Sequence, residues 1–313
     1  MLNYVTTSSP VRLSLVGGSS DLDSYVQKHG RGSVISFTPN LYTYVSMYRD
    51  CLGRNKLDNK YILNYSKREE ISRIQDIQNE LVREFFIAHD CLPCSIHMTS
   101  DVFSHGSGLA VSSSYACSIS AAINEFSGKS LSQTEWGVNA HATEKRINPL
   151  LGQQDVFGCC VGGFKKIEFS SVGLPKYTFL PTDIFDHYDV CLLFTGTVRN
   201  STDILKTVEV PDEDVFNPMV EEAEKCILNG DYKSFMDLIR DGWKAKKRTS
   251  ASIAVGHIAD MDCWLSSLDG CVSHKLCGAG SGGFFLCFFE KGKIPDDRFY
   301  RVGLSPHGTR RLV

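Results

Sequence analysis

A glycine- and serine-rich stretch at residues 104–114 constrains the fold of this 313-residue chain more than any other feature, because it joins a strand-like segment to a helical one. Residues 95–99 alternate apolar and polar side chains, and residues 115–125 form an alanine-rich helical pattern. A helix that begins after such a loop offers unpaired backbone N–H groups to an anion, and glycine lets the backbone approach closely. The loop lacks the Gly-Lys-Ser/Thr of a Walker A motif, so it is either another phosphate loop or a turn whose serines cap the next helix.

The other segments mix strand-like and helical patterns without strict alternation of the two. Strands are predicted at residues 11–16, 33–37, 42–48, 164–169, 190–195, 272–276 and 283–289, and helices at 68–88, 132–146, 213–228, 232–246 and 253–268. Ser132 and Glu135 form a capping-box pattern where the second of these helices begins. The mixture predicts an α+β fold of packed layers, with a domain boundary within residues 170–190 that no linker composition marks.

Charge and composition exclude several kinds of partner. The chain has 33 basic and 36 acidic side chains and a net charge of -3, so no basic excess points to nucleic acid or an anionic membrane. The most apolar run, residues 284–289, is far shorter than a membrane span, and residues 1–10 lack the basic start and apolar stretch of a signal peptide. We therefore expect a cytoplasmic protein whose twelve cysteines stay reduced.

Glu144 and Asp155 are two carboxylates that lie eleven residues apart, on either side of a loop with Pro149 and Gly152. One of them could hold Mg2+ while the other orients or deprotonates a hydroxyl group. The alternative is a pair of solvated surface carboxylates with no shared role.

Two further segments combine glycine with charged residues. In residues 275–283, four glycines within six positions could turn backbone N–H groups toward a phosphate, or could serve a tight connection that needs positive φ angles. Arg12 lies in an otherwise apolar strand, where it needs a carboxylate or phosphate partner unless it points to water from a sheet edge. Asp21, which follows Gly17 and Gly18, could bind a sugar hydroxyl group or close an Asx-turn.

Six segments resemble, in this order, the motifs of the GHMP kinases (galactokinase, homoserine kinase, mevalonate kinase and phosphomevalonate kinase), and within them the D-glycero-D-manno-heptose 7-phosphate kinases. They are PVRLSLVGGSSD, HGSGLAVSSSYA, AHATEKRINPLLGQQDVFGCCVGGFKKIEF, TGTVRNSTDIL, DGWKAKKR and KLCGAGSGGFFLCF, and they extend over nearly the whole chain. The resemblance implies two lobes with ATP and sugar between them. Residues 1–185 would be an α+β lobe, and residues 186–313 a ferredoxin-like α/β sandwich.

The resemblance also implies roles in binding ATP and in catalysis. The loop would wrap the ATP phosphates through Gly106, Ser107, Gly108, Leu109, Ser112 and Ser113, and the nucleotide site would be closed by Gly278, Gly280 and Gly282. Ser113 and Glu144 match positions that hold Mg2+. Asp155 matches the aspartate that contacts the hydroxyl group to be phosphorylated, and Arg12 matches a basic residue beside that aspartate.

On the sugar side, Asp21 with Gly17 and Gly18 matches the sugar-binding segment of the resembled family. A phosphorylated substrate needs a second anion site, and the candidates for it are Arg31, Arg199, Lys246 and Lys247. The two lysines also suit a solvated helix C-terminus, which the helix dipole favours.

The sequence departs from the family pattern at Ala110 and Val111, where relatives have glycine and serine or threonine, and at Leu41, where heptose kinases tend to have lysine. Ala110 adds a Cβ where the loop could need an unusual backbone angle. We expect an enzyme that uses ATP and Mg2+ to phosphorylate the anomeric hydroxyl group of heptose 7-phosphate, giving the 1,7-bisphosphate for nucleotide-activated heptose. The alternatives are a kinase for another sugar such as fucose, and a non-catalytic protein that binds ATP and sugar. The sequence leaves the oligomeric state open.

Overall fold

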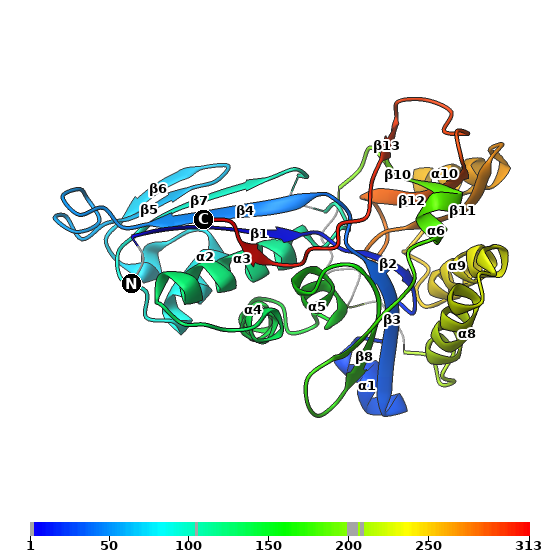
Figure 1. Cartoon of the computed structure of the whole chain (residues 1–313), viewed down its shortest axis with the longest axis horizontal. Helices are drawn as coiled ribbons and strands as arrows, with labels where there is room; N and C mark the ends of the chain where they lie inside the picture. The colour runs from blue at the N-terminus through cyan, green and yellow to red at the C-terminus, as the bar shows by residue number, and fades with distance from the viewer. Residues whose placement is uncertain (1–2, 104–105, 199–205, 207–209) are drawn as a thin grey trace.

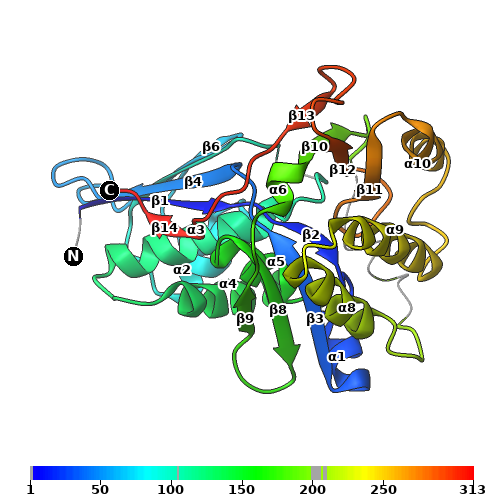
Figure 2. The same ribbon diagram turned by 45° about the vertical axis from the view of Figure 1, so that its right-hand side comes forward.

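The computed structural model describes residues 3–103, 106–198, 206 and 210–313, and these form three sheets with helices packed against them. One sheet lies at each end of the molecule and the third lies between them (Figures 1 and 2). Strands and helices both occur along the whole chain and pack against one another as separate layers, so the predicted α+β class is confirmed. Among the described residues, no helix combines the length and apolarity that crossing a bilayer requires.

The largest sheet has the strand order β14-β1-β4-β7-β5-β6 and is antiparallel except where β5 meets β7. Its strands are β1 (Tyr4–Pro10), β4 (Tyr42–Tyr48), β5 (Tyr61–Asn64), β6 (Arg68–Ile71), β7 (Ser95–Ser100) and β14 (Arg310–Arg311). One face is covered by α2 (Glu80–Ala88), α3 (Val111–Phe126) and α4 (Gln133–Ile147), as Figure 1 shows. Apolar residues of these strands and helices form one core between the two layers.

Small side chains let α3 pack directly on this sheet. Twelve of its sixteen residues are buried, and most of these are alanine, serine or cysteine. Ser114 Oγ donates to the carbonyl of Ser9 over 2.8 Å, and Thr7 Oγ1 donates to the carbonyl of Ser118 over 2.8 Å. These bonds fix α3 against β1, and they thereby fix the place where the glycine- and serine-rich loop ends.

The central sheet has the order β2-β3-β8-β9 and is antiparallel throughout. It consists of β2 (Leu13–Val16), β3 (Arg31–Phe37), β8 (Phe164–Ser170) and β9 (Lys176–Phe179), with the short helices α1 (Asp23–His29) and α5 (Gln154–Cys160) packed beside it. Because β2 directly follows Arg12 and α5 begins beside Asp155, this sheet brings the start of the chain next to a segment about halfway along it.

The third sheet has the order β11-β12-β10-β13. Its strands are β10 (Tyr188–Phe194), β11 (Cys271–Leu276), β12 (Phe284–Glu290) and β13 (Phe299–Arg301), and the short α6 (Ile184–His187) precedes β10. The connection from β10 to β11 supplies α8 (Phe216–Leu228), α9 (Tyr232–Arg248) and α10 (His257–Ser267). The strand order is that of the predicted ferredoxin-like sandwich, but the crossover from β12 to β13 is a turn with Gly292 and Pro295 instead of a helix.

The end of the chain returns to the largest sheet. After β13 the chain forms a bridge between Leu304 and Pro39, and β14 then pairs with β1. The predicted division into residues 1–185 and 186–313 assigns this tail to the C-terminal lobe, although β14 packs on the sheet of the N-terminal lobe. The boundary between the two lobes stays a prediction.

The prediction of one helix over residues 68–88 is wrong for residues 68–79 and correct for residues 80–88. Residues there form β6, a 3-10 turn at η1 (Ile74–Asp76), and only then α2. Glu69 lies in the strand and accepts the N–H groups of Gln78 and Asn79 over 2.7 and 3.1 Å, while the Asn79 side chain caps α2 by accepting the N–H of Val82. The other predicted helices are present, and Ser132 and Glu135 form the predicted capping box at the start of α4.

Candidate active site

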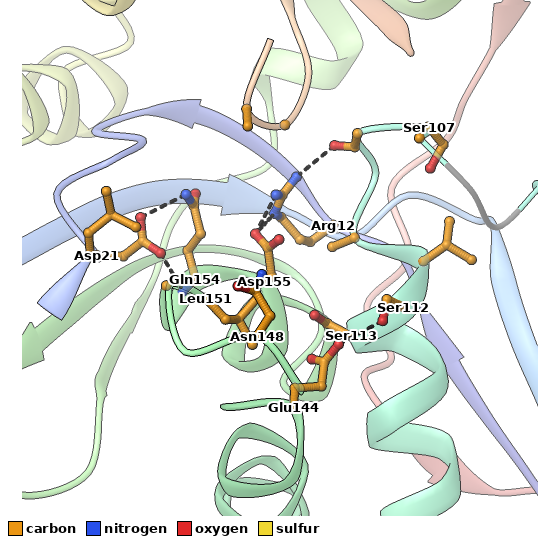
Figure 3. Close-up of a pocket in the computed structure, with 18 of the residues that line it drawn as sticks. Arg12, Asp21, Ser107, Ser112, Ser113, Glu144, Asn148, Leu151, Gln154 and Asp155 are labelled. Atoms are coloured by element: carbon orange, nitrogen blue, oxygen red, sulfur yellow. Dashed lines mark hydrogen bonds and ion pairs between the residues drawn. The ribbon is translucent and has the colours of Figure 1, made fainter. Parts of the chain in front are cut away.

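A cavity of about 510 Å3 lies where the three sheets meet, and most of the predicted site residues line it. It is bounded by the start of α3, the end of α4, the start of α5, the segment after β2 and the turn after β11 (Figure 3). The predicted residues in its lining are Arg12, Asp21, Gly106, Ser107, Gly108, Ser112, Ser113, Glu144, Asp155, Lys246 and Gly278. They come from segments far apart in the sequence, so the fold alone brings them together.

The start of α3 is open toward this cavity. Its N-cap residue, Ala110, has φ 61° and ψ 37° and makes no side-chain cap, and the first turn contains no acidic residue. The first N–H groups of a helix have no acceptor within the helix, so those of α3 are available to a ligand. Ala110 has the unusual backbone angle that its departure from the family pattern led us to expect. A left-handed conformation costs a residue with a Cβ about 1 kcal/mol or more.

The second glycine-rich turn, at residues 275–283, packs against the loop at residues 106–113, and few of its residues line the cavity. Gly108 has φ +77°, and a Cβ there would lie 2.6 Å from the carbonyl oxygen of Cys277. Gly283 has φ +93°, and a Cβ there would overlap the backbone of Ser107, whose carbonyl accepts the N–H of Phe284 over 3.2 Å. In this turn Gly278 lines the cavity, whereas Gly280 and Gly282 pack on Ile253 and Thr197 and do not, so their role in closing the nucleotide site stays a prediction.

Arg12 has the carboxylate partner that its apolar surroundings require. The side chain is 3% exposed, and its Nε donates to Asp155 Oδ1 over 3.0 Å, with a second guanidinium nitrogen bonded to the same oxygen. Its Nη1 donates to the carbonyl of Gly108 over 3.2 Å. Arg12 therefore links the phosphate-type loop to the start of α5, and the dashed lines in Figure 3 show both contacts.

Glu144 lies in the last turn of α4 and is buried beside the first turn of α3. Ser112 Oγ donates to its Oε1 over 2.8 Å, while Oε2 is buried and has no hydrogen-bond partner within the part of the chain that the structure describes. Burial raises the pKa of Glu144 to about 7, although the hydroxyl groups of Ser113 and Ser112 favour the carboxylate. A buried carboxylate oxygen that lacks a partner, with serine hydroxyls beside it, suits a hard cation such as Mg2+.

Asp21 is bound to the start of α5 from the opposite side. It is 1% exposed and accepts the Gln154 backbone N–H over 3.0 Å and Gln154 Nε2 over 2.8 Å. Burial, with the nearby Asp155 carboxylate, raises the pKa of Asp21 to about 6. Gln154 was not singled out from the sequence, although it directly precedes Asp155 in the quoted motif.

Several predicted residues lie elsewhere. Arg31 pairs with Glu221 and Lys247 pairs with Asp262, and neither lines the cavity, so a role for either in binding a substrate phosphate stays a prediction. Leu109 is buried in the core and offers its carbonyl to the Arg12 N–H. Gly17 does not line the cavity, because it packs its backbone against that of β3. Gly18 borders a small recess beside the cavity, and Arg199 lies outside the described residues.

The chain is similar in sequence to a kinase family model and to two sugar kinases. Residues 73–163 match the family model described as GHMP kinases N terminal domain. The D-glycero-alpha-D-manno-heptose 7-phosphate kinase of Campylobacter jejuni is 25% identical over 316 residues, which cover 93% of this chain and 91% of that protein. The L-fucokinase/L-fucose-1-P guanylyltransferase of Bacteroides fragilis is 26% identical over 238 residues, which cover 65% of this chain and 24% of that protein.

Among solved structures, the Lactococcus lactis galactokinase complexed with galactose shares the fold. The TM-score is 0.77 at 15% sequence identity, and the alignment covers 99% of this chain and 95% of that chain. The resemblance drawn from the six sequence segments is confirmed by these matches.

Proposed function

We propose that the chain is a kinase of the GHMP superfamily that transfers the γ-phosphoryl group of ATP to the anomeric hydroxyl group of D-glycero-D-manno-heptose 7-phosphate. The product would be the 1,7-bisphosphate, an intermediate toward nucleotide-activated heptose. One observation carries the proposal: Arg12, Glu144 and Asp155 converge on a single cavity with the open start of α3. Phosphoryl transfer requires mainly positioning and charge neutralisation, which this set of groups supplies.

The ATP phosphates would lie against residues 106–113. The first backbone N–H groups of α3 have no acceptor within the helix, and the positive end of the helix dipole favours negative charge beside them. No side chain of α3's own first turn competes for these groups, since that turn has no acidic residue and Ala110 cannot cap it.

Glu144 and Ser113 are the residues that would hold Mg2+. The partnerless Oε2 of Glu144 is the observation that fits the ion, and the described residues hold no cluster of three or more His, Cys, Asp or Glu side chains that could form a cage of protein ligands. Mg2+ commonly takes few protein ligands together with phosphate oxygens and water. When bound, the ion neutralises charge on the phosphate oxygens.

Asp155 would orient the sugar hydroxyl group and accept its proton. Both bonds from Arg12 go to Oδ1, which leaves Oδ2 to accept a hydrogen bond from a substrate hydroxyl group. The side chain of Asp155 is 27% exposed, at the cavity wall. Arg12 fixes this carboxylate and places a positive charge beside the reacting groups.

The sugar would lie near Asp21 and Gln154. The heptose 7-phosphate is favoured because the relative that covers most of the chain carries that substrate in its name. A free sugar such as fucose is the second candidate, because a shorter match joins residues of this chain to a fucokinase.

An assay of ADP release with a panel of sugars tests the function. We expect turnover with heptose 7-phosphate in the presence of ATP and Mg2+, and far less with heptose, fucose and galactose. Turnover of fucose with no response to heptose 7-phosphate would move the substrate assignment to the second candidate. ATP binding without transfer to any sugar would indicate a non-catalytic protein.

A further inference from the structure

A small recess adjoins the cavity, and Arg12 lines both spaces. Its lining comprises Arg12, Ser14, Gly18, Gln154, Lys246, Lys275, Leu276 and Gly278, and its volume is about 10 Å3. Four of these residues also line the main cavity, so the recess is a side branch of it. A space of this size holds roughly one oxygen atom the size of water.

All charged side chains that line the recess are cationic, whereas Asp21, Glu144 and Asp155 lie along the main cavity. Of the three cations, Arg12 is neutralised by Asp155, and Lys246 donates to the carbonyl of Gly278. Lys275 is 6% exposed and donates to the carbonyl of Leu15 over 2.8 Å. No ion pair between Lys275 and a carboxylate exists among the described residues.

A buried ammonium group without an anion is costly, and burial accordingly lowers the pKa of Lys275 to about 8. A backbone carbonyl supplies only a partial negative charge. The recess therefore has a positive charge that the described protein does not balance, on the side of the cavity that Gln154 and Asp21 share.

Two buried polar atoms of the recess residues lack partners within the described chain. They are the hydroxyl oxygen of Ser14 and Oε1 of Gln154. The Gln154 amide is fixed in orientation, because its Nε2 donates to Asp21, so Oε1 can only accept. Ser14 can donate to an oxygen, and Gln154 can accept from a hydroxyl group. The occupant that satisfies both carries a negatively charged oxygen close to a hydroxyl group, as a sugar phosphate does.

We propose that this recess is an anion subsite that takes one oxygen of the phosphate group of the sugar substrate, with Lys275 and Ser14 as its donors. The body of the phosphate lies in the main cavity, since the recess is too small for the whole group. No described residue of the loop at 106–113 lines the recess, although Gly278 of the second glycine-rich turn does. Its assignment to the sugar therefore rests on Gln154, which lines the recess and is bonded to Asp21. The inference rests on the proposed function, and it makes Lys275 a specificity residue for phosphorylated sugars.

The test compares heptose 7-phosphate with unphosphorylated heptose in wild type, Lys275→Met and Ser14→Ala. A hydrogen bond to a charged group is lost in each variant, so we expect KM for heptose 7-phosphate to rise about ten- to a hundredfold in Lys275→Met and about three- to tenfold in Ser14→Ala. The KM values for ATP and for unphosphorylated heptose should stay within about twofold of wild type. Lys165→Met is the matched control, because Lys165 is also a buried lysine that donates to a backbone carbonyl, that of Gly158, but lies outside both spaces. It should leave the ratio of the two sugar KM values unchanged.

Binding of the two sugars without ATP, measured by calorimetry, gives a second readout that does not need turnover. Loss of affinity for heptose 7-phosphate alone supports the subsite. An equal loss for both sugars, or a rise in KM for ATP in place of the sugar phosphate, overturns it. If Lys275→Met does not melt cooperatively, Ser14→Ala decides, and an unchanged KM there means that the recess holds water. If the wild-type enzyme phosphorylates heptose 7-phosphate and heptose equally well, the subsite is refuted while the kinase function stands. If it transfers phosphate to neither sugar, the proposed function is refuted, and the calorimetric affinities then decide whether the subsite exists.

Discussion

Two helices, α3 and α5, begin at the wall of the same cavity, and they differ in the side chains placed around their first turns. At the start of α5, the protein supplies its own anions: Asp21 accepts the backbone N–H of Gln154, and Asp155 lies in the first turn. At the start of α3, the N-cap residue Ala110 makes no side-chain cap, and the first turn contains no acidic residue. Both starts offer the same backbone chemistry, so the difference lies in the side chains placed around them.

The contrast indicates which helix start receives the ATP phosphates. The first N–H groups of α3 have no anion of the protein's own beside them, whereas those of α5 are already served by Asp21 and Asp155, so the ATP phosphates would be attracted to the start of α3. Glu144 lies beside the start of α3, and its buried Oε2, which has no hydrogen-bond partner among the described residues, is compensated by a proton or by a bound cation. The predictions below change one side of this contrast at a time.

The largest effect is expected for Asp155→Asn, which removes the negative charge at the start of α5 but keeps the shape of the side chain. If Asp155 acts on the sugar hydroxyl group, kcat should fall on the order of 10^2- to 10^4-fold with little change in ATP affinity. Single-turnover kinetics and nucleotide titration measure the two quantities separately. Turnover equal to wild type would remove Asp155 from the reaction.

The second prediction concerns the pH dependence of stability in the absence of ligand. Burial raises the pKa of Glu144 to about 7 in the folded state, from a reference value of 4.5 in an unfolded chain. Between these pH values the folded state binds more protons than the unfolded state, so the free energy of unfolding falls as pH rises from 4.5 to 7. In Glu144→Gln this contribution is absent, and the variant should gain up to roughly 3 kcal/mol relative to wild type across the window.

Denaturant titrations of wild type and Glu144→Gln at intervals of pH measure that difference. Asp21, whose pKa is raised to about 6, titrates in the same direction and is present in both proteins, so it cancels. Parallel curves for the two proteins would mean that Glu144 is ionised in the free protein without penalty.

The third prediction uses the same variant with ligand present. Glu144→Gln replaces a charged ligand of Mg2+ by a neutral one, so the Mg2+ concentration for half-maximal activity should rise at least about tenfold. In wild type this concentration should increase as pH falls below about 7, because protons then compete with the cation for Glu144, and in Glu144→Gln the dependence should vanish. Initial rates over a Mg2+ series at three pH values measure both effects.

The charged residues Arg12, Glu144 and Asp155 could be predicted because each differs from the pattern of the segment around it. Arg12 interrupts an apolar strand, and Glu144 and Asp155 flank a loop with Pro149 and Gly152. Lys275 belonged to a quoted motif, but its environment could not be predicted, since its ammonium group binds the carbonyl of Leu15 from 260 residues away. Contacts over such separations depend on the assembled sheets.

The strand β1 was missed for a related reason. Thr7, Ser8 and Ser9 give it a polar appearance, yet all three are buried. Thr7 is satisfied by the carbonyl of Ser118, and Ser9 by Thr309, which lies 300 residues later. A pattern of apolar residues predicts a strand that faces an apolar core, and it fails for a strand whose inward side chains are hydrogen-bonded to other elements.

The smallest effect concerns the conformation that opens the start of α3. Ala110 has φ 61°, a left-handed backbone that its Cβ disfavours and that glycine adopts freely. Ala110→Gly relieves this strain but adds freedom to the unfolded chain, so the net gain in the free energy of unfolding should be about 0.5–1 kcal/mol. Ala245→Gly in α9, where the backbone is helical, should instead lose about 1 kcal/mol. Thermal unfolding of the two variants compares them directly. If Ala110→Gly destabilises the protein as much as Ala245→Gly does, the open start of α3 is not held in the left-handed conformation, and the contrast with α5 then rests on the missing cap and the missing acidic residue alone.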